Sequence, residues 1–144
     1  MRRGVILFFL VVISVLNSFA QKDLDSLWMN WKNPKNHDTI RSYSLEKFIW
    51  GKLIFTKPDS ALKLGFEELN FSSKIKDEKW RSYALNTIGI SYFYLGQYDS
   101  ATYYQLKSIK IKEKLKMWDK VTNSYNNLGG IQHQLGNYDA ALKY

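Results

Sequence analysis

The sequence predicts an all-α fold, a right-handed superhelix (solenoid) of antiparallel helical hairpins stacked with a 40-residue period. The stretch LGQYDSA at 95–101 returns as LGNYDAA at 135–141, and a weaker counterpart, KPDSA, stands at 57–61. The same spacing aligns IG at 88–89 with LG at 128–129. A fixed period of this length is typical of stacked-repeat proteins. No segment sustains a period-two alternation of apolar and polar residues, so we expect no sheet.

The composition is that of a globular chain and bounds its chemistry. With 144 residues, the chain has room for one domain at most. Aromatic residues make up 16% of it, and we expect them to fill the space between helices because each ring buries a large apolar area. A binding surface of exposed rings is the alternative. The chain has no cysteine, which excludes disulfides, thiolate metal sites and a cysteine nucleophile.

The first 20 residues have the layout of a secretory signal peptide. A short positive start precedes an apolar run at 5–16, and small residues at Ser18 and Ala20 predict cleavage after Ala20. The run is shorter than the roughly 20 residues of a membrane-spanning helix, and an uncleaved membrane anchor stays open as the alternative. The ending FAQ at 19–21 resembles those of exported proteins of Gram-negative bacteria. We therefore expect an exported, periplasmic protein.

The rest of the chain is expected to consist of helices joined by short links, which makes successive helices antiparallel neighbours. An N-terminal extension at 21–40, with a short amphipathic helix, precedes a repeat array at 41–144. The array divides into repeats at about 41–77 and 78–117 and a truncated one at 118–144. Its helices are expected at 41–55, 58–73, 78–95, 98–116, 119–135 and 138–144.

Residues with special backbone or capping chemistry mark the ends of these helices. Pro58 can open a helix, because the first turn tolerates a missing N–H. Asp77 and Asp119 suit the N-cap position, where a carboxylate accepts hydrogen bonds from free backbone N–H groups. Gly96 and Gly136 suit the left-handed turn that ends a helix, since a residue without Cβ adopts it at low cost.

The repeated positions carry a family pattern. In the second repeat they are Leu85, Ile88, Gly89, Tyr92, Gly96, Tyr98 and Ala101, and in the third Tyr125, Leu128, Gly129, Gly136, Tyr138 and Ala141. These residues resemble the signature of the tetratricopeptide repeat (TPR), and the resemblance covers roughly 41–144, or about two and a half repeats. The glycine and alanine of each repeat are expected where two helices approach closely. The first repeat departs from the pattern with Ile49 in the glycine place and Lys52 in the tyrosine place, and the third has Gln132 in the tyrosine place.

The period is longer than the one most common in that family, and we expect the extra length in the helix at 98–116 and the link that follows it. This long form, with SIKIKEK at 108–114 and NNLG at 126–129, resembles the exported N-terminal sensory repeats of bacterial histidine kinases and related signalling regulators. In that group a membrane helix and an output domain follow the array. The resemblance implies a protein- or peptide-binding module at the sensory front of a signal-transduction protein. A free-standing periplasmic scaffold or assembly protein, and a non-catalytic fragment of a larger enzyme, are the alternatives.

The last expected helix, at 138–144, is much shorter than its counterpart at 98–116. A solenoid end normally carries a capping element with a polar outer face. Two interpretations follow. Either the chain is the front piece of a longer protein, which would then anchor it to the membrane, or a partner covers this end.

Nothing in the sequence indicates catalysis. His37 and His133 have no second histidine or carboxylate at metal-ligand spacing. No serine stands in a nucleophile elbow, and no glycine-rich phosphate loop occurs. We therefore expect no enzyme activity, no cofactor and no bound metal.

Five lysines crowd the segment 107–116: Lys107, Lys110, Lys112, Lys114 and Lys116. We expect them to form a solvated outer face. The alternative is a basic patch for nucleic acid or anionic lipid. Glu113 interrupts the run and an exported chain rarely meets nucleic acid, so a nucleic-acid partner is disfavoured.

The candidate binding site is the concave groove that the first helix of each hairpin lines in TPR proteins. Asn86 and Asn126 lie one repeat period apart and are expected to hydrogen-bond the backbone of an extended peptide. The alternative is that some groove residues pack against the next hairpin. The carboxylate clamp of chaperone-type TPR domains is not matched, because Glu46, Asn86, Thr87 and Asn127 occupy its lysine and arginine places. The candidate groove residues are Tyr43, Glu46, Trp50, Tyr83, Asn86, Ile90, Phe93, Tyr94, Asn123, Asn126 and His133.

Overall fold

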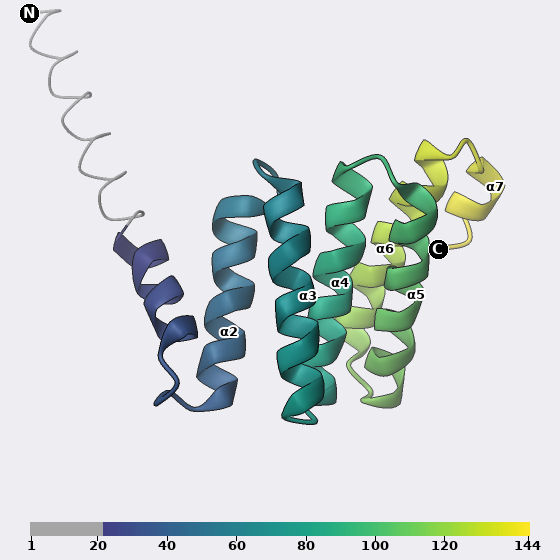
Figure 1. The fold of residues 1–144 in the computed structure, drawn as a ribbon. Helices are drawn as coiled ribbons and strands as arrows, with labels where there is room; N and C mark the ends of the chain where they lie inside the picture. Colours follow the sequence, from purple (N-terminus) through teal and green to yellow (C-terminus); the bar gives the residue numbers. More distant parts are fainter. Residues whose placement is uncertain (1–21) are drawn as a thin grey trace, which may run out of the picture.

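The structure, a computed structural model, describes residues 22–144 and is a row of antiparallel helices (Figure 1). The predicted signal peptide at 1–20 lies outside the described residues. No strand occurs between residues 22 and 144. In the same part of the chain, no helix combines the length and the apolar character that crossing a membrane requires. The all-α prediction is confirmed for this part of the chain.

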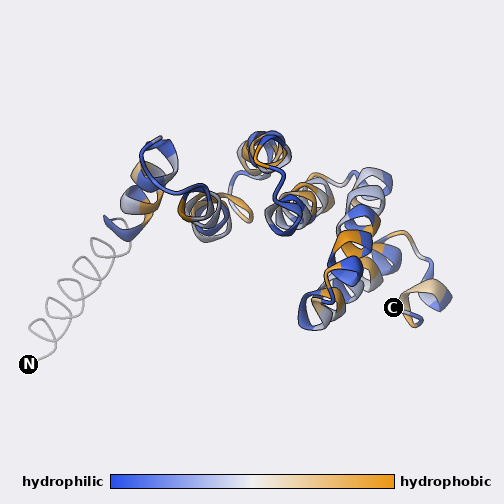
Figure 2. Cartoon of the chain, turned by 90° about the horizontal axis from the view of Figure 1, so that it is seen from below, coloured by the Kyte–Doolittle hydropathy of each residue, from blue (hydrophilic) through white to orange (hydrophobic). Residues whose placement is uncertain are grey.

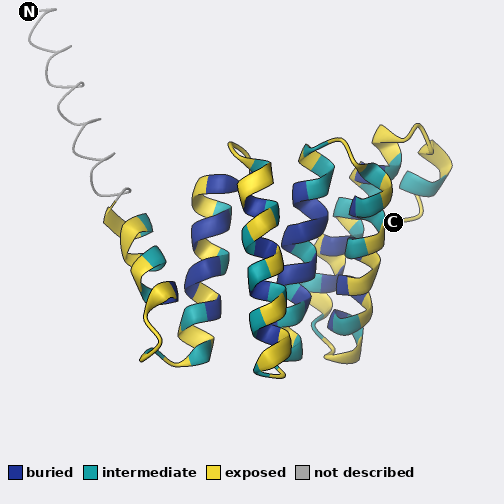
Figure 3. Ribbon diagram, in the orientation of Figure 1, coloured by how far each residue is buried: buried dark blue, intermediate teal, exposed yellow. Residues whose placement is uncertain are grey.

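Residues 22–32 are helical and are followed by helices in consecutive pairs. Each helix packs against the next, and Figure 2 shows the first of them nearly end-on in a staggered row. Buried residues lie where neighbouring helices face each other (Figure 3). The elements are α2 (Asp38–Phe48), the π-helix η1 (Ile49–Leu53), α3 (Pro58–Lys74), α4 (Glu78–Tyr94), α5 (Tyr98–Lys114), α6 (Trp118–Gln134) and α7 (Tyr138–Ala141).

Helices α2 to α7 begin at even intervals of half the sequence period, so each period contains two equal structural steps. Four links share one turn, in which a single residue has positive φ and the next residue's N–H bonds back across the helix end. After α4, for example, Gln97 N donates to Tyr92 O at 2.9 Å. This is the Schellman motif, which satisfies the free carbonyls at a helix C-terminus. The residues with positive φ are Lys76, Gly96, Lys116 and Gly136.

Two expectations about helix length and capping were wrong. The helix expected at 98–116 holds no extra length, because α3, α4, α5 and α6 have 17 residues each. The extra length of this repeat, relative to the period most common in the family, is therefore divided between both helices of a hairpin. Asp119 is not an N-cap, since Met117 holds that position and Asp119 lies in the first turn of α6. There its charge still favours the positive end of the helix dipole.

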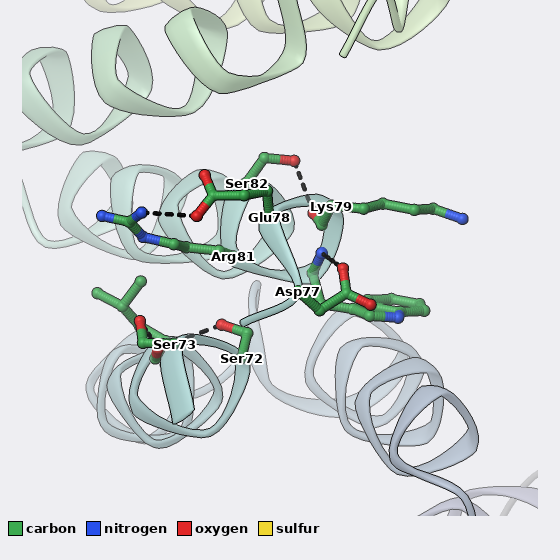
Figure 4. Close-up of polar contacts among 9 residues, drawn as sticks. Ser72, Ser73, Asp77, Glu78, Lys79, Arg81 and Ser82 are labelled. Atoms are coloured by element: carbon green, nitrogen blue, oxygen red, sulfur yellow. Dashed lines mark hydrogen bonds and ion pairs between the residues drawn. The ribbon is translucent and has the colours of Figure 1, made fainter. Parts of the chain in front are cut away.

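Asp77 is the N-cap of α4, as predicted. Its Oδ1 accepts a hydrogen bond from Trp80 N at 3.1 Å (Figure 4). An ion pair between Arg81 and Glu78 at 2.9 Å lies in the same first turn. The link between the first two hairpins is therefore held by the left-handed turn at Lys76 and by this cap.

The first hairpin differs from the others. The helix expected at 41–55 begins earlier, at Asp38, and changes to a π-helix at Ile49–Leu53, where Ile54 N donates to Ile49 O. The change starts at Ile49, the position that holds glycine in the later repeats. Helix 22–32 covers this hairpin, with the Trp28 ring 5.0 Å from Phe48 and the Trp31 ring packed edge-on against Phe71. Aromatic rings fill the space between helices here, as expected.

Candidate functional site

The first helices of the three hairpins, α2, α4 and α6, border an open groove of about 980 Å³. Almost all of its lining comes from these helices, and α5, a second helix of a hairpin, contributes Lys112. The lining residues are Thr39, Ile40, Tyr43, Glu46, Lys47, Trp50, Lys79, Trp80, Tyr83, Asn86, Lys112, Lys120, Asn123, Asn126 and Asn127.

The groove residues keep the register of the repeat. Positions three apart lie on one face of a helix, and three such positions line the groove in every hairpin. Aromatic and apolar side chains prevail on α2 and α4, and amides on α6. The three sets are Ile40, Trp80 and Lys120, then Tyr43, Tyr83 and Asn123, then Glu46, Asn86 and Asn126.

Most of the candidate residues named from the sequence are brought together in this groove. They are Tyr43, Glu46, Trp50, Tyr83, Asn86, Asn123 and Asn126. Their part in binding stays a prediction. Asn86 is only partly free to contact a peptide, because its Oδ1 accepts a hydrogen bond from Lys112 Nζ at 3.4 Å. Among residues 22–144, its Nδ2 donates to no partner.

Ile90 was expected in the groove but does not line it. It is buried in the core cluster around Leu45 and Ile49. Near this level, the indole Nε1 of Trp50 donates to Thr87 Oγ1 of α4 at 3.1 Å. The indole thereby links η1 to α4 one turn before Ile90.

The other three candidates also lie outside the groove lining. Phe93 packs against the core cluster that contains Leu128. The Tyr94 ring meets Phe55 edge-on at 5.4 Å, and the His133 ring meets Tyr138 edge-on at 5.3 Å. The prediction extended the groove along the whole length of each first helix. In the structure, the side chains near the C-terminal ends of α4 and α6 pack against other aromatic or core residues instead.

The repeat-signature residues lie at helix contacts and turns. A Cβ added to Gly89 would lie 3.2 Å from Ala101 O and 3.0 Å from the Gln105 side chain. In the next hairpin, a Cβ at Gly129 would lie 3.3 Å from Ala141 O. Each glycine thus stands where two helix backbones approach closely. The tyrosines of the signature differ in burial: Tyr92 stacks on Tyr104, Tyr98 borders the core beside Phe93, and Tyr138 is exposed.

Sequence reasoning missed the role of Lys112. It was expected on a solvated face with the other lysines of 107–116, which are exposed, but Lys112 is only 3% exposed. Its Nζ donates to Ser124 Oγ at 2.7 Å. The helical spacing of Gln105, Ser108 and Ile109 with Lys112 gives one stripe facing inward, and this spacing is the signal that could have identified it.

Burial makes Lys112 an unusual base. Desolvation, and secondarily the positive charge of Lys120, lower its pKa to about 8. No carboxylate oxygen between residues 22 and 144 lies within 4 Å of its Nζ to form an ion pair. Lys120 itself pairs with Asp119 at 2.9 Å, a hydrogen bond that raises the pKa of Lys120 and lowers that of Asp119.

Glu68 on α3 is a second buried charged residue, placed away from the groove lining. It is fully buried, and neither carboxylate oxygen has a hydrogen-bond partner in the described part of the chain. Burial raises its pKa well above the ordinary value, and the negative charge of Glu46 adds to the shift. Its counterpart one repeat period later is Ser108, whose Oγ donates to Ser82 O at 2.7 Å.

His37 has a structural role at the start of α2. His37 is the N-cap of α2, where its Nδ1 accepts a hydrogen bond from Thr39 N at 3.2 Å. Within residues 22–144, no group of three or more histidine, aspartate or glutamate side chains is placed to hold a metal ion.

Comparison with known proteins agrees with this architecture. Residues 80–144 match the family model of the tetratricopeptide repeat. The crystal structure of the TPR domain of Arabidopsis FLU is similar, with a TM-score of 0.66 and 20% identity over 74% of this chain and 90% of that chain. No curated protein matches in a sequence comparison. The segment 80–144 is therefore similar to tetratricopeptide repeats, which are typically non-catalytic and generally bind proteins or peptides.

Proposed function

We propose that the chain is a binding module whose groove between α2, α4 and α6 takes an extended segment of a partner protein. The observation that carries this proposal is the register of the groove. The same three positions of each first helix, one repeat period apart, line one opening of about 980 Å³. A surface built by repetition suits a ligand with a repeating backbone, and stacked repeats use their concave faces in this way.

The chemistry of the lining suits a peptide. Tyr43 is half exposed and meets Trp80 edge-on, which leaves aromatic surface for apolar side chains of a partner. Asn123 and Asn126 on α6 are exposed. A carboxamide carries both donors and an acceptor, so these side chains can pair with the N–H and C=O groups of an extended backbone.

Peptide selection followed by mutation tests the proposal. A peptide selected from a random library on the full chain is expected to lose at least about tenfold in affinity for the variant Asn123→Ala plus Asn126→Ala. Neither asparagine side chain hydrogen-bonds another residue of 22–144, so the variant should keep its helicity by circular dichroism. Asn70→Ala, an exposed change on α3 outside the groove, is the matched control. Unchanged affinity of the double variant, or failure to select any peptide, would contradict the proposal.

We further propose that the module is exported and forms the sensory front of a bacterial signal-transduction protein. The signal-peptide layout of residues 1–20 and the long repeat form support this setting. Sequencing the N-terminus of the exported protein is expected to give Gln21, and a start at Met1 would refute cleavage. A reading frame that continues past Tyr144 into a membrane helix and an output domain is expected. A stop codon there would favour a free-standing scaffold.

A further inference from the structure

Lys112 brings a positive charge to the groove without a counter-charge of its own. Its ammonium is almost fully buried, and burial of a charged group is unfavourable unless the charge is paired. The two hydrogen bonds that it makes go to neutral oxygens, Ser124 Oγ and Asn86 Oδ1. The side chain lines the groove, so an anionic group of a ligand can reach it from there.

The hydrogen-bond inventory leaves one donor for a ligand. An ammonium has three N–H groups, and Ser124 and Asn86 accept two of them. Tyr83 also lines the groove, and its ring centroid lies 5.8 Å from Nζ. A pKa of about 8 keeps Lys112 mainly in its charged form at pH 7.

The charges of the groove are divided along its length. Lys79, Lys112 and Lys120 lie on α4, α5 and α6, and Lys120 is already paired with Asp119. At the other end, on α2, Glu46 pairs with Lys47 at 3.6 Å. This division suits a single carboxylate placed near α6. It does not suit a nucleic-acid backbone, whose binding depends on many phosphate contacts.

We infer that the groove selects partner segments carrying an aspartate or glutamate side chain, whose carboxylate pairs with Lys112 Nζ on the floor of the groove. This inference rests on the proposed function and names the chemistry of the partner. The lysine comes from the second helix of its hairpin, and the carboxylate belongs to a side chain within the peptide. A charge-assisted hydrogen bond in a partly dry site is stronger than a neutral one and adds selectivity.

Two pools of decapeptides provide the probe. Both are acetylated and amidated at their ends and random at every position except a fixed central one, which is glutamate in one pool and glutamine in the other. Fluorescence anisotropy is measured with the full chain, with Lys112→Met and with Lys110→Met. Lys110 is exposed on the same helix and does not line the groove, so it is the matched control.

The wild-type chain is expected to bind the glutamate pool about tenfold more tightly than the glutamine pool. Lys112→Met should abolish the preference for the glutamate pool, while Lys110→Met should leave both the preference and the affinities unchanged. Equal binding of the two pools by the wild type, or a preference that survives Lys112→Met, would overturn the inference and leave peptide binding intact. Absence of binding to both pools would overturn the proposed function and the inference with it. The comparison of the two pools on the wild-type chain is informative even if a variant fails to fold.

Discussion

The first and second hairpins each bury one ionisable side chain, but the two side chains stand at different positions of the repeat. The first has Glu68 and Ser72, and the second has Ser108 and Lys112 in the corresponding places. Glu68 is sealed in the helix packing without a partner, while Lys112 has two neutral partners and opens onto the groove. Burying either group is unfavourable for folding, but only the lysine can be compensated by a ligand.

The largest expected effect comes from moving the acid into the second hairpin. Ser108→Glu would place a carboxyl at a fully buried site and remove the hydrogen bond to Ser82 O. We expect a loss of about 3 kcal/mol in the free energy of unfolding, measured by urea denaturation, because the larger side chain overpacks a fully buried site and leaves Ser82 O without its donor, even though Lys112 lies one turn further along the same face. Ser108→Ala is the control and should lose about 1 kcal/mol. A tolerated glutamate at 108 would show that the two hairpins bury acids equally well.

Removing the acid from the first hairpin is expected to stabilise the chain. Glu68→Met keeps the volume and removes two unpaired oxygens, so we expect a gain of about 1–3 kcal/mol at pH 7. The gain should be smaller at pH 4. Below the ordinary glutamate pKa the carboxyl is protonated in both folded and unfolded chains. As pH rises toward the raised pKa of Glu68, the unfolded chain ionises first and wild-type stability falls. A gain independent of pH would contradict a buried, neutral Glu68.

The two hairpins also differ at the position of Gly89, whose counterpart in the first hairpin is Ile49. Gly89→Ala places a methyl group against Ala101 O and should destabilise by about 1–2 kcal/mol. Gly130→Ala on α6 has no atom within 4 Å of the added Cβ and should stabilise by up to about 1 kcal/mol. Thermal unfolding followed by circular dichroism distinguishes the two. Equal changes in stability for the two variants would mean that the close approach of α4 and α5 is not the reason for glycine at position 89.

Lys112→Met should stabilise the free protein by about 1 kcal/mol at pH 7, since a buried charge is replaced by an apolar chain of similar size. Wild-type stability should rise between pH 8 and the ordinary lysine pKa of 10.5, because the folded chain releases this proton first. Urea titrations over that range should show the rise in the wild type and its absence in the variant. The groups that face Lys112 are Tyr83 and Asn86 of α4 and Lys120 and Ser124 of α6. An identical pH profile for both proteins would contradict the assignment.

The smallest expected effect concerns the links. The turn within the second hairpin uses Gly96, whereas the turn between the first two hairpins uses Lys76 at φ 58°. Lys76→Gly should gain about 0.5 kcal/mol, because glycine avoids the strain of positive φ but loses more entropy on folding. The melting temperature is the readout. A loss of stability would mean that the Lys76 side chain stabilises the turn.

The sequence was sufficient for the fold because the 40-residue period and the glycine turns are local signals. The N-cap at Asp77 follows from the capping preference of aspartate, and most of the groove face follows from the TPR resemblance. The left-handed lysine Lys76 could not be predicted, since only glycine marks such turns by composition. The polar partners of Lys112, Ser124 on α6 and Asn86 on α4, depend on which helices meet at its side chain, and the burial of Ile90 depends on how α4 packs against Leu45 and Ile49. Both are properties of packing between helices.

Photo-crosslinking tests most directly whether the partner segment lies in the groove. Benzoylphenylalanine in place of Tyr43, which is 50% exposed and lines the groove, is compared with the same residue in place of Tyr103, which is 52% exposed outside it. A selected peptide is expected to crosslink at position 43 and not at position 103, as read by mass spectrometry. Crosslinking at 103 without crosslinking at 43 would contradict binding in the groove.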